Sequence, residues 1–365
     1  MENFFVMAKL NRLTVKGFKS IKSLEDFELK NLNVLIGANG AGKSNFIGIF
    51  RLLNNIYHKN LQLYVQKQGG IDSFLHFGRQ ITDEIYLKLH FRLNAYEFVL
   101  IPTNDNRFTF ERELNHFYGW GDYPYKKIDL GNGHSESLLS ENYSSIANHI
   151  KSAIESWKIY HFHDTSDTAK VKRQSQINDN LVLKSDAENL APYLYMLKDS
   201  HIAEYQRIVD TIRLVLPFFD DFVQRENVEL VELEWFQKGH FDTPLKAHLL
   251  SDGSLRFICL MTLLLQPIEL LPDTILIDEP ELGLHPYAIA VLADVIKQVS
   301  EDKQIIISTQ SVELVNHFEP NDIVVVNQEN GVSDFERLDN EKLATWLEEY
   351  SLGELWTSNL FGGRP

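Results

Sequence analysis

The sequence lacks the features that mark several protein classes. It has one cysteine, Cys259, which excludes an internal disulfide framework and favours a reducing, cytoplasmic location. No apolar run reaches the roughly 18 residues of a transmembrane helix, and the first nine residues are too short and wrongly flanked for a signal peptide. No sustained heptad pattern or internal repeat is visible, which excludes a long coiled coil and a solenoid. We therefore expect no membrane contact.

Basic residues are also scarce. There are 35 Lys and Arg residues against 51 Asp and Glu residues, so the formal net charge is −16. Binding to nucleic-acid phosphates needs clustered Lys and Arg, so we do not expect DNA to coat the whole surface. A local basic stripe is still compatible with this charge. The candidate stripe consists of Lys170, Lys172 and Arg173, and an ordinary solvated face is the alternative.

Two histidines and an aspartate precede this stripe, namely His161, His163 and Asp164. Their spacing is compatible with a metal site, but no further His or Cys cluster accompanies them. A hydrogen-bonded structural or interdomain role is therefore favoured over metal binding.

The strongest motif lies at residues 37–44, which match the P-loop pattern G-x-x-x-x-G-K-[ST] at every fixed position. Residues 32–36 read as a buried strand before it, and Phe46, Ile49, Phe50 and Leu53 follow at helical spacing. A strand, a glycine loop and a helix N-terminus together aim backbone N–H groups at an anion. The sequence thus predicts a site for the phosphates of ATP.

Individual roles follow from the chemistry of this motif. The glycines let the backbone approach phosphate oxygens closely. Lys43 is expected to reach the β- and γ-phosphates, and Ser44 to ligand Mg²⁺. The expected nucleotide-binding residues are Gly37, Ala38, Asn39, Gly40, Ala41, Gly42, Lys43, Ser44 and Asn45.

The first part of the chain predicts an antiparallel sheet. Residues 84–93 alternate between apolar and polar side chains without a break, which is typical of a half-buried strand. Further strands are predicted over 10–18, 27–29, 32–36, 96–101 and 108–114. A β-meander is therefore expected after the P-loop helix.

The middle of the chain has weaker patterns. Helices are predicted over 144–157, 187–198 and 202–216, and a strand over 228–235.

Helices and strands alternate regularly in the last part, which favours a parallel sheet. The predicted helices cover 254–265 and 286–299, and the predicted strands cover 274–277, 304–307 and 323–326. Asp339 or Asn340 can cap a last helix, with an apolar face made of Leu343, Trp346, Leu347 and Tyr350.

A second motif lies at residues 274–279, where a buried apolar strand ends in Asp278 and Glu279. This is the pattern of a Walker B motif, in which Asp278 would hold Mg²⁺ and Glu279 would polarise the attacking water. The signal is weak alone and strong beside a P-loop. Because the two motifs are far apart in the sequence, an insertion is expected to divide one nucleotide-binding core. The predicted domains are an N-terminal ATPase lobe over 1–114, a mostly helical insertion over 115–235 and a C-terminal ATPase lobe over 236–365.

Residues 250–256 resemble the signature motif of ABC-type ATPases, Leu-Ser-Gly-Gly-Gln. Ser251 and Gly253 match the motif, and Asp252 departs from it at a variable position. In that family the motif grips the γ-phosphate bound by the opposite subunit. The resemblance therefore implies a homodimer that sandwiches ATP, while Ser251 can equally cap the following helix.

Other stretches resemble RecF-like and SMC-like heads. Residues 281–286 are similar to the D-loop and Leu-His-Pro stretch of these proteins, and Gln310 stands where ABC ATPases have their switch histidine. A Thr-Gln-Ser variant is seen in stand-alone, RecF-like AAA-family ATPases. Residues 10–95 and 245–330, with 160–165 and 352–365, look like short bacterial ATPases of the RecF and overcoming-lysogenization-defect type.

The resemblance implies an α/β fold of the P-loop NTPase, ABC-ATPase head type. Its mixed sheet is expected beside an antiparallel β-subdomain and a helical insertion. The implied catalytic residues are Glu279, Gln310 and Lys43, and either Gln66 or Gln68 would serve as the Q-loop glutamine.

The implied function is ATP hydrolysis that regulates an effector linked to DNA or to defence, in phage defence or DNA repair. No TOPRIM-type nuclease domain is expected after the ATPase, so a nuclease or toxin-like effector is expected on a separate chain. DNA is a further candidate partner. Two alternatives remain, an ABC transporter-type subunit and an ATP-binding scaffold without turnover. The split core disfavours the first, and the intact Lys43, Ser44, Asp278 and Glu279 disfavour the second.

Overall fold

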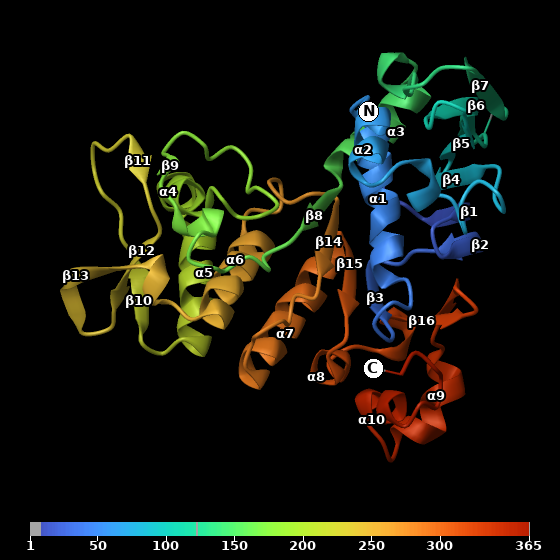
Figure 1. Ribbon diagram of the computed structural model, residues 1–365. Helices are drawn as coiled ribbons and strands as arrows, with labels where there is room; N and C mark the ends of the chain where they lie inside the picture. Colours follow the sequence, from blue (N-terminus) through green and yellow to red (C-terminus); the bar gives the residue numbers. More distant parts are fainter. Residues whose placement is uncertain (1–8, 122, 365) are drawn as a thin grey trace. The chain divides into compact units, whose positions relative to one another are not determined.

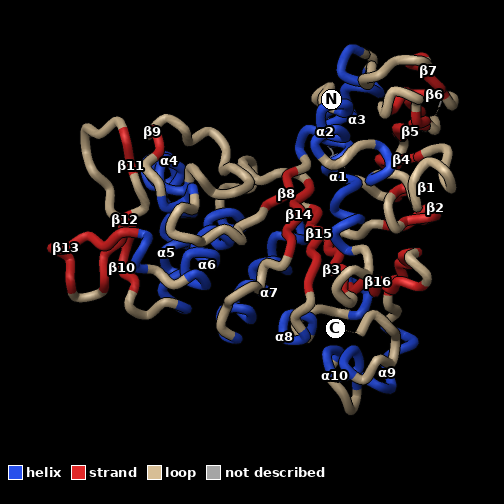
Figure 2. Tube along the Cα trace, viewed as in Figure 1, coloured by secondary structure: helices blue, strands red, loops and turns tan. Residues whose placement is uncertain are grey.

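The computed structural model describes residues 9–121 and 123–364, and its elements are drawn in Figure 1 and coloured by type in Figure 2. The expectation of no signal peptide falls largely on residues 1–8, outside the described part. Contacts divide the chain into two compact units. The first unit combines two segments of the chain, one that ends at Trp157 and one that begins at Glu319. The second unit runs from Lys158 to Phe318.

The first unit contains a six-stranded antiparallel sheet, ordered β2-β1-β4-β5-β6-β7. The alternation predicted for the fourth strand is present, since Ile85, Leu87, Leu89 and Phe91 are buried on one face. Helices α1 and α3 contact each other in this unit, and Trp157, at the end of α3, packs its ring on Phe50 of α1 and Phe91 of β4. The elements are β1 (Arg12–Phe18), β2 (Ile21–Glu28), β4 (Ile85–Phe91), β5 (Asn94–Pro102), β6 (Phe108–Phe117), β7 (Lys126–Gly131), α1 (Lys43–Tyr57), α2 (Leu61–Lys67) and α3 (Ser145–Ser156).

The same unit also contains strands of mixed direction. Strand β3 (Leu32–Ile36) is buried along its whole length and pairs in parallel with β16 (Ile323–Glu329). Strand β17 (Val332–Arg337) pairs antiparallel with β16, and α9 (Asn340–Leu347) and α10 (Leu352–Thr357) follow it. Because β3 leads directly into the glycine loop, the loop starts from a rigid, buried strand.

The second unit places β14 in parallel between β15 and β8, as its alternation of strands and helices predicts. Helices α4 to α7 pack against one another in sequence order. Cys259 lies inside α6, where burial raises the pKa of its thiol to about 12, so it is a structural residue. The elements are β8 (Lys158–Tyr160), α4 (Leu190–Ser200), α5 (Ile202–Val215), α6 (Asp252–Leu265), β14 (Thr274–Asp278), α7 (Pro286–Asp302), β15 (Gln304–Thr309) and α8 (Val312–Val315).

Short strands complete the second unit. Strands β10 (Phe219–Phe222), β12 (Glu234–Gln237) and β13 (His240–Lys246) form one small sheet. Strands β9 (Ser175–Gln176) and β11 (Leu230–Val231) form a two-stranded pair.

Several expectations differ from the structure. The strand predicted over 228–235 is interrupted, because β11 and β12 pair with different partners. The region 115–235 mixes helices with short strands, and the compact units divide at 157/158 and 318/319 instead of at the predicted lobe boundaries. The three-lobe division stays a prediction about where the motifs lie.

The apolar face predicted for the last helix is wrong. Asp339 does cap α9, but the helix ends at Leu347 and Leu343 is its buried apolar residue. Trp346 and Tyr350 are 48% and 45% exposed. A spacing that suits one helix face does not decide whether another element covers that face.

Candidate functional site

The glycine loop between β3 and α1 has the backbone of an anion-binding turn. Gly37, Gly40 and Gly42 have φ angles of +153°, +81° and +121°, which side chains with a Cβ rarely adopt. Lys43 begins α1, and its buried ammonium donates to the carbonyl oxygens of Gly37 at 2.6 Å and Ala38 at 3.1 Å. Ser44 is exposed in the first turn of the helix. The loop thus combines a mobile cation with helix N-terminal amides, which is a cradle for phosphate.

Two serines outside the motif brace this loop. The hydroxyl of Ser333 in β17 donates to the Ala41 carbonyl at 2.5 Å, and its oxygen lies at hydrogen-bond distance, 2.7 Å, from the Ser20 hydroxyl. The Asn45 amide also donates to Ser20, at 2.7 Å. Sequence reasoning missed both serines because Ser333 is 292 residues from Ala41 and neither belongs to a motif. Asn45, predicted to bind nucleotide, here anchors the start of α1.

The glycine at the start of the loop has no room for a side chain. A Cβ at Gly37 would lie 2.3 Å from the Val326 carbonyl oxygen, whereas a Cβ at Gly40 would meet open space. We therefore expect Gly37→Ala to lower the free energy of unfolding by about 1–3 kcal/mol, and Gly40→Ala to lower it less. Thermal unfolding monitored by circular dichroism measures both. Equal melting temperatures for the two variants would contradict the close packing of Gly37 on β16.

The acidic motif forms a second cluster, at the end of β14. Strands β14 and β15 are paired in register, with Asp278 beside Ser308. As a result, three consecutive residues at and just after the end of β15 each donate a side-chain hydrogen bond to one acid at or just after the end of β14. The pairs are Ser308 with Asp278, Thr309 with Glu281, and Gln310 with Glu279.

The backbone at Glu279 turns the acid toward β15. Its φ of +46° is left-handed, and its N–H donates to the Ser308 carbonyl at 2.8 Å. The Gln310 amide donates to Glu279 without carrying charge, so it orients the carboxylate without adding a second charge beside it. Gln310 thus lies beside the predicted catalytic acid.

Glu281 is a member of this cluster that sequence reasoning did not select. Its Oε1 accepts the Thr309 hydroxyl at 2.5 Å and the Gln310 N–H at 3.3 Å. Burial raises the pKa of this carboxyl, and its Oε2 has no hydrogen-bond partner among the described residues. The sequence had pointed to it only as the first residue of the D-loop-like stretch over 281–286, without a role of its own.

The signature-like stretch opens α6 and packs on the segment after the acids. Ser251 caps α6, its hydroxyl accepting the Ser254 N–H at 3.2 Å. A Cβ on Gly253 would lie 2.2 Å from the Gly283 carbonyl oxygen, so this glycine permits close backbone packing. Arg256 continues the contact by donating to the Leu282 carbonyl at 3.0 Å. These contacts fix α6 against residues 281–285.

Arg256 also reaches the histidine pair of the sequence. Its guanidinium donates to the carbonyl oxygens of Phe162 at 3.2 Å and His163 at 2.9 Å. The His163 Nε2 in turn lies 2.8 Å from the Asp278 carbonyl oxygen, to which it donates. His163 therefore has the hydrogen-bonded structural role that was favoured over metal binding. Within residues 9–121 and 123–364, no three His, Cys, Asp or Glu side chains are grouped to hold a metal ion.

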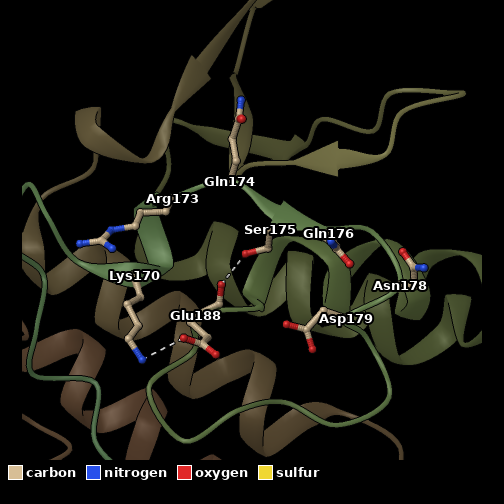
Figure 3. A pocket seen from close by; sticks show the side chains of 8 residues that line it. All are labelled: Lys170, Arg173, Gln174, Ser175, Gln176, Asn178, Asp179 and Glu188. Atoms are coloured by element: carbon tan, nitrogen blue, oxygen red, sulfur yellow. Dashed lines mark hydrogen bonds and ion pairs between the residues drawn. The ribbon is translucent and has the colours of Figure 1, made fainter.

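The proposed basic stripe is not a free cationic surface. Lys170 is paired with Asp186 and Glu188, each at 2.9 Å, and Figure 3 shows it facing Glu188. Lys172 is buried, with its ammonium 2.6 Å from the Thr165 carbonyl oxygen. The prediction of a cationic stripe is therefore corrected, because local carboxylates and a carbonyl already bind the ammonium groups of Lys170 and Lys172.

The remaining sequence candidates lie in exposed positions. Arg173 donates to the Thr168 carbonyl and lines a hollow of about 540 Å³ with residues of both charge signs (Figure 3). Gln66 and Gln68 are exposed at the end of α2, so either stays a candidate for the Q-loop glutamine. In the part of the chain that the structure describes, no helix is long and apolar enough to cross a membrane.

Comparisons with known proteins agree with this arrangement. The chain is similar to the crystal structure of an SMC head bound to the C-winged helix domain of ScpA, with 16% identity, a TM-score of 0.61, and coverage of 91% of this chain and 99% of that chain. It is also similar to an SMC head with an extended coiled coil from Pyrococcus furiosus, bound to the C-terminal domain of ScpA, with 16% identity, a TM-score of 0.53, and coverage of 94% and 99%. No curated protein matches the chain. The fold is therefore that of an SMC head, an ABC-type P-loop ATPase domain, as predicted.

A family model decides the membership of the chain. It is described as "AAA domain, putative AbiEii toxin, Type IV TA system", and it matches residues 32–316, which include the glycine loop, the signature-like stretch and the acidic motif. The protein therefore belongs to this AAA-domain family, and it has the nucleotide-binding fold of a RecF/SMC-like ATPase.

Proposed function

We propose that this protein binds and hydrolyses Mg-ATP, and that bound ATP closes two copies into a dimer that regulates a separate effector. The observation that carries the proposal is the cluster of acids at the end of β14. The Ser308 hydroxyl donates to Asp278, and the Gln310 amide donates to Glu279. Each of the two adjacent carboxylates is therefore oriented separately, which suits one for binding Mg²⁺ and the other for positioning water. A chain that only bound ATP would not need an ordered second acid.

The P-loop supplies the binding step of this proposal. Its amides and the Lys43 ammonium would contact the β- and γ-phosphates, and Lys43 would exchange the carbonyls of Gly37 and Ala38 for phosphate oxygens. The Ser44 hydroxyl and the Asp278 carboxylate are hard oxygen donors of the kind that Mg²⁺ prefers, so these residues would hold it. When bound, the ion would neutralise charge on the phosphates.

The hydrolytic step would be carried by Glu279. A carboxylate can orient and polarise a water molecule as a general base, provided that it stays ionised. Gln310 is suited to support it, because an amide donor fixes the direction of the carboxylate without taking its charge. Gln310 would therefore take the place of the switch histidine. Unlike a histidine, it does not titrate near neutral pH.

The dimer and the effector rest on the family and on the signature-like stretch. Ser251 and Gly253 open α6, where helix N-terminal amides could receive a γ-phosphate from a second copy. The similar SMC head binds a protein domain of ScpA, which supports a protein partner for this chain. The family description names a toxin of a toxin–antitoxin system, which favours a nuclease or toxin-like effector in phage defence over one in DNA repair. A cytoplasmic location fits this role.

Release of phosphate from Mg-ATP tests the proposal. We expect turnover by the wild-type chain and a loss of roughly 100-fold or more in Asp278→Asn, because a catalytic metal ion supplies several kcal/mol of stabilisation. Asp302→Asn is the matched control, since Asp302 is exposed at the end of α7. ATP binding without any turnover would favour the scaffold alternative, and unchanged turnover in Asp278→Asn would overturn the metal assignment.

A further inference from the structure

The outer face of the antiparallel sheet carries an aromatic and basic surface that the ATPase site does not use. Residues Ile85 to Phe91 bury alternate side chains toward the core, so Lys88 and His90 project from the opposite face. The β6–β7 hairpin continues this face at one edge of the sheet (Figure 1). We call this surface the outer platform and define it by Arg12, His90, Arg92, Tyr118, Tyr125 and Lys127.

Tyr118 is the centre of the outer platform. Its ring is stacked with His90 at 5.5 Å and 23°, and with His116 at 6.1 Å and 15°. The ring of Tyr125 lies 5.9 Å away, and the Lys88 ammonium lies 5.9 Å from the Tyr118 ring centroid. These contacts fix the orientation of a ring that is still 41% exposed. An oriented, accessible ring is preorganised for stacking.

The tip of the same hairpin presents further aromatic rings to solvent. Trp120 and Tyr123 are 63% and 71% exposed, and Tyr125 is 53% exposed. Two backbone hydrogen bonds of 2.9 and 3.1 Å close the tip between Trp120 and Tyr123. Together with Tyr118, four exposed aromatic residues therefore lie within eight positions of one structured hairpin. Aromatic residues gathered on a surface in this way mark a binding site.

The charge around these rings is positive, although the chain as a whole is acidic. Among the residues that the structure describes, the guanidinium of Arg92 and the ammonium groups of Lys126 and Lys127 have no acidic partner. Arg12 pairs with Asp26 in a contact whose two side chains are more than half exposed, and such surface ion pairs are weak.

One carboxylate on this face is shared among several cations. Glu97 lies 3.4 Å from Lys88, 3.1 Å from Arg112 and 3.2 Å from His116. The close approach of the His116 ring nitrogen, with the nearby lysine and arginine, lowers the pKa of Glu97 to about 2. Glu97 therefore stays ionised. Its single negative charge lies beside two positive charges, those of Lys88 and Arg112, so the net charge of this group is positive.

A hollow of about 450 Å³ combines the two features. It is lined by Asn11, Arg12, His90, Arg92 and Tyr118, so two guanidinium groups lie beside an aromatic face. Guanidinium groups bind phosphate oxygens, and an aromatic face stacks on a nucleobase. A polynucleotide offers both partners, because each of its units carries one phosphate charge and one planar base.

We propose that the outer platform binds a single-stranded polynucleotide, with Tyr118 stacking on a base and Arg92 contacting a phosphate. A single strand is favoured over a duplex because only unpaired, unstacked bases expose their faces to aromatic side chains. An acidic peptide would use the cations but would leave the aromatic rings unexplained. The proposal does not depend on ATP hydrolysis, and binding is tested without nucleotide.

Fluorescence anisotropy of labelled oligonucleotides with the full chain tests the proposal. The probes are oligodeoxythymidine and oligouridine of about 20 nucleotides, and a duplex of equal length is compared with them. We expect both single strands to bind more tightly than the duplex at low salt, and a difference between the two strands identifies DNA or RNA. Tyr118→Ala should weaken binding by about tenfold, while Tyr118→Phe, which keeps the ring, should bind as the wild type does.

The salt dependence separates the role of the arginine from that of the ring. Arg92→Ala should reduce the slope of log affinity against log salt by about 0.7, as expected for the loss of one phosphate contact to a single strand. Arg107→Ala and Tyr350→Ala are controls, because both side chains are exposed outside the platform. Circular dichroism confirms that each variant is folded. Absence of binding by the wild type at low salt, or equal affinity of Tyr118→Ala and wild type, would overturn the proposal.

Discussion

Lys43→Ala is expected to abolish measurable ATP binding. Lys43 is the only basic residue between positions 37 and 50, so no neighbour in the loop can replace its charge. Its ammonium is buried and donates to the Gly37 and Ala38 carbonyls, which places it at the loop where the phosphates are expected. Loss of a buried charge-assisted contact costs about 2–5 kcal/mol, or roughly 30-fold to several thousand-fold in affinity.

Titration calorimetry with ATP and Mg²⁺ measures this effect directly. The glycine loop should keep its shape in the variant, because Ser333 and Ser20 brace it from outside the lysine contacts. Lys59→Ala is the control, since Lys59 follows α1 and pairs with Glu141 in an exposed contact. Wild-type affinity in Lys43→Ala would mean that the glycine loop is not the phosphate site.

Glu279→Gln is expected to hold two copies of the chain together in the presence of Mg-ATP. Glutamine has nearly the shape of glutamate and can still accept the hydrogen bond from Gln310, but it cannot take a proton from water. Hydrolysis would then stop while ATP binding continues. If ATP completes the interface between two copies, the closed dimer accumulates in proportion to bound nucleotide.

Sedimentation velocity with and without Mg-ATP provides the measurement. A monomer under both conditions would contradict the ATP-closed dimer. If the chain is a dimer with and without Mg-ATP, the ATP-closed interface is tested with Ser251→Arg instead. This variant places a bulky side chain at the start of α6. That variant should bind ATP as a monomer and lose turnover, whereas Ser358→Arg, at an exposed position after α10, should behave as the wild type does.

The local elements of this protein follow from its sequence. The buried strand over 32–36, the glycine loop and the helix that starts at Lys43 lie where the pattern predicts them, because each depends on residues a few positions apart. The alternation of β4 and the strand that ends at Asp278 are local in the same sense. The acidic motif also identified Glu279, and the resemblance to ABC-type ATPases identified Gln310, while the roles of both stay predictions.

The groups that support the site were decided only by the tertiary structure. Ser333 reaches the Ala41 carbonyl across 292 residues, and Ser308 reaches Asp278 across 30 residues. The burial of Lys172 and the exposure of Trp346 were likewise visible only in the folded chain. Periodicity and motifs report on neighbours within one or two turns of a helix or strand, whereas hydrogen bonds between distant segments depend on strand order and register, which only the folded chain defines.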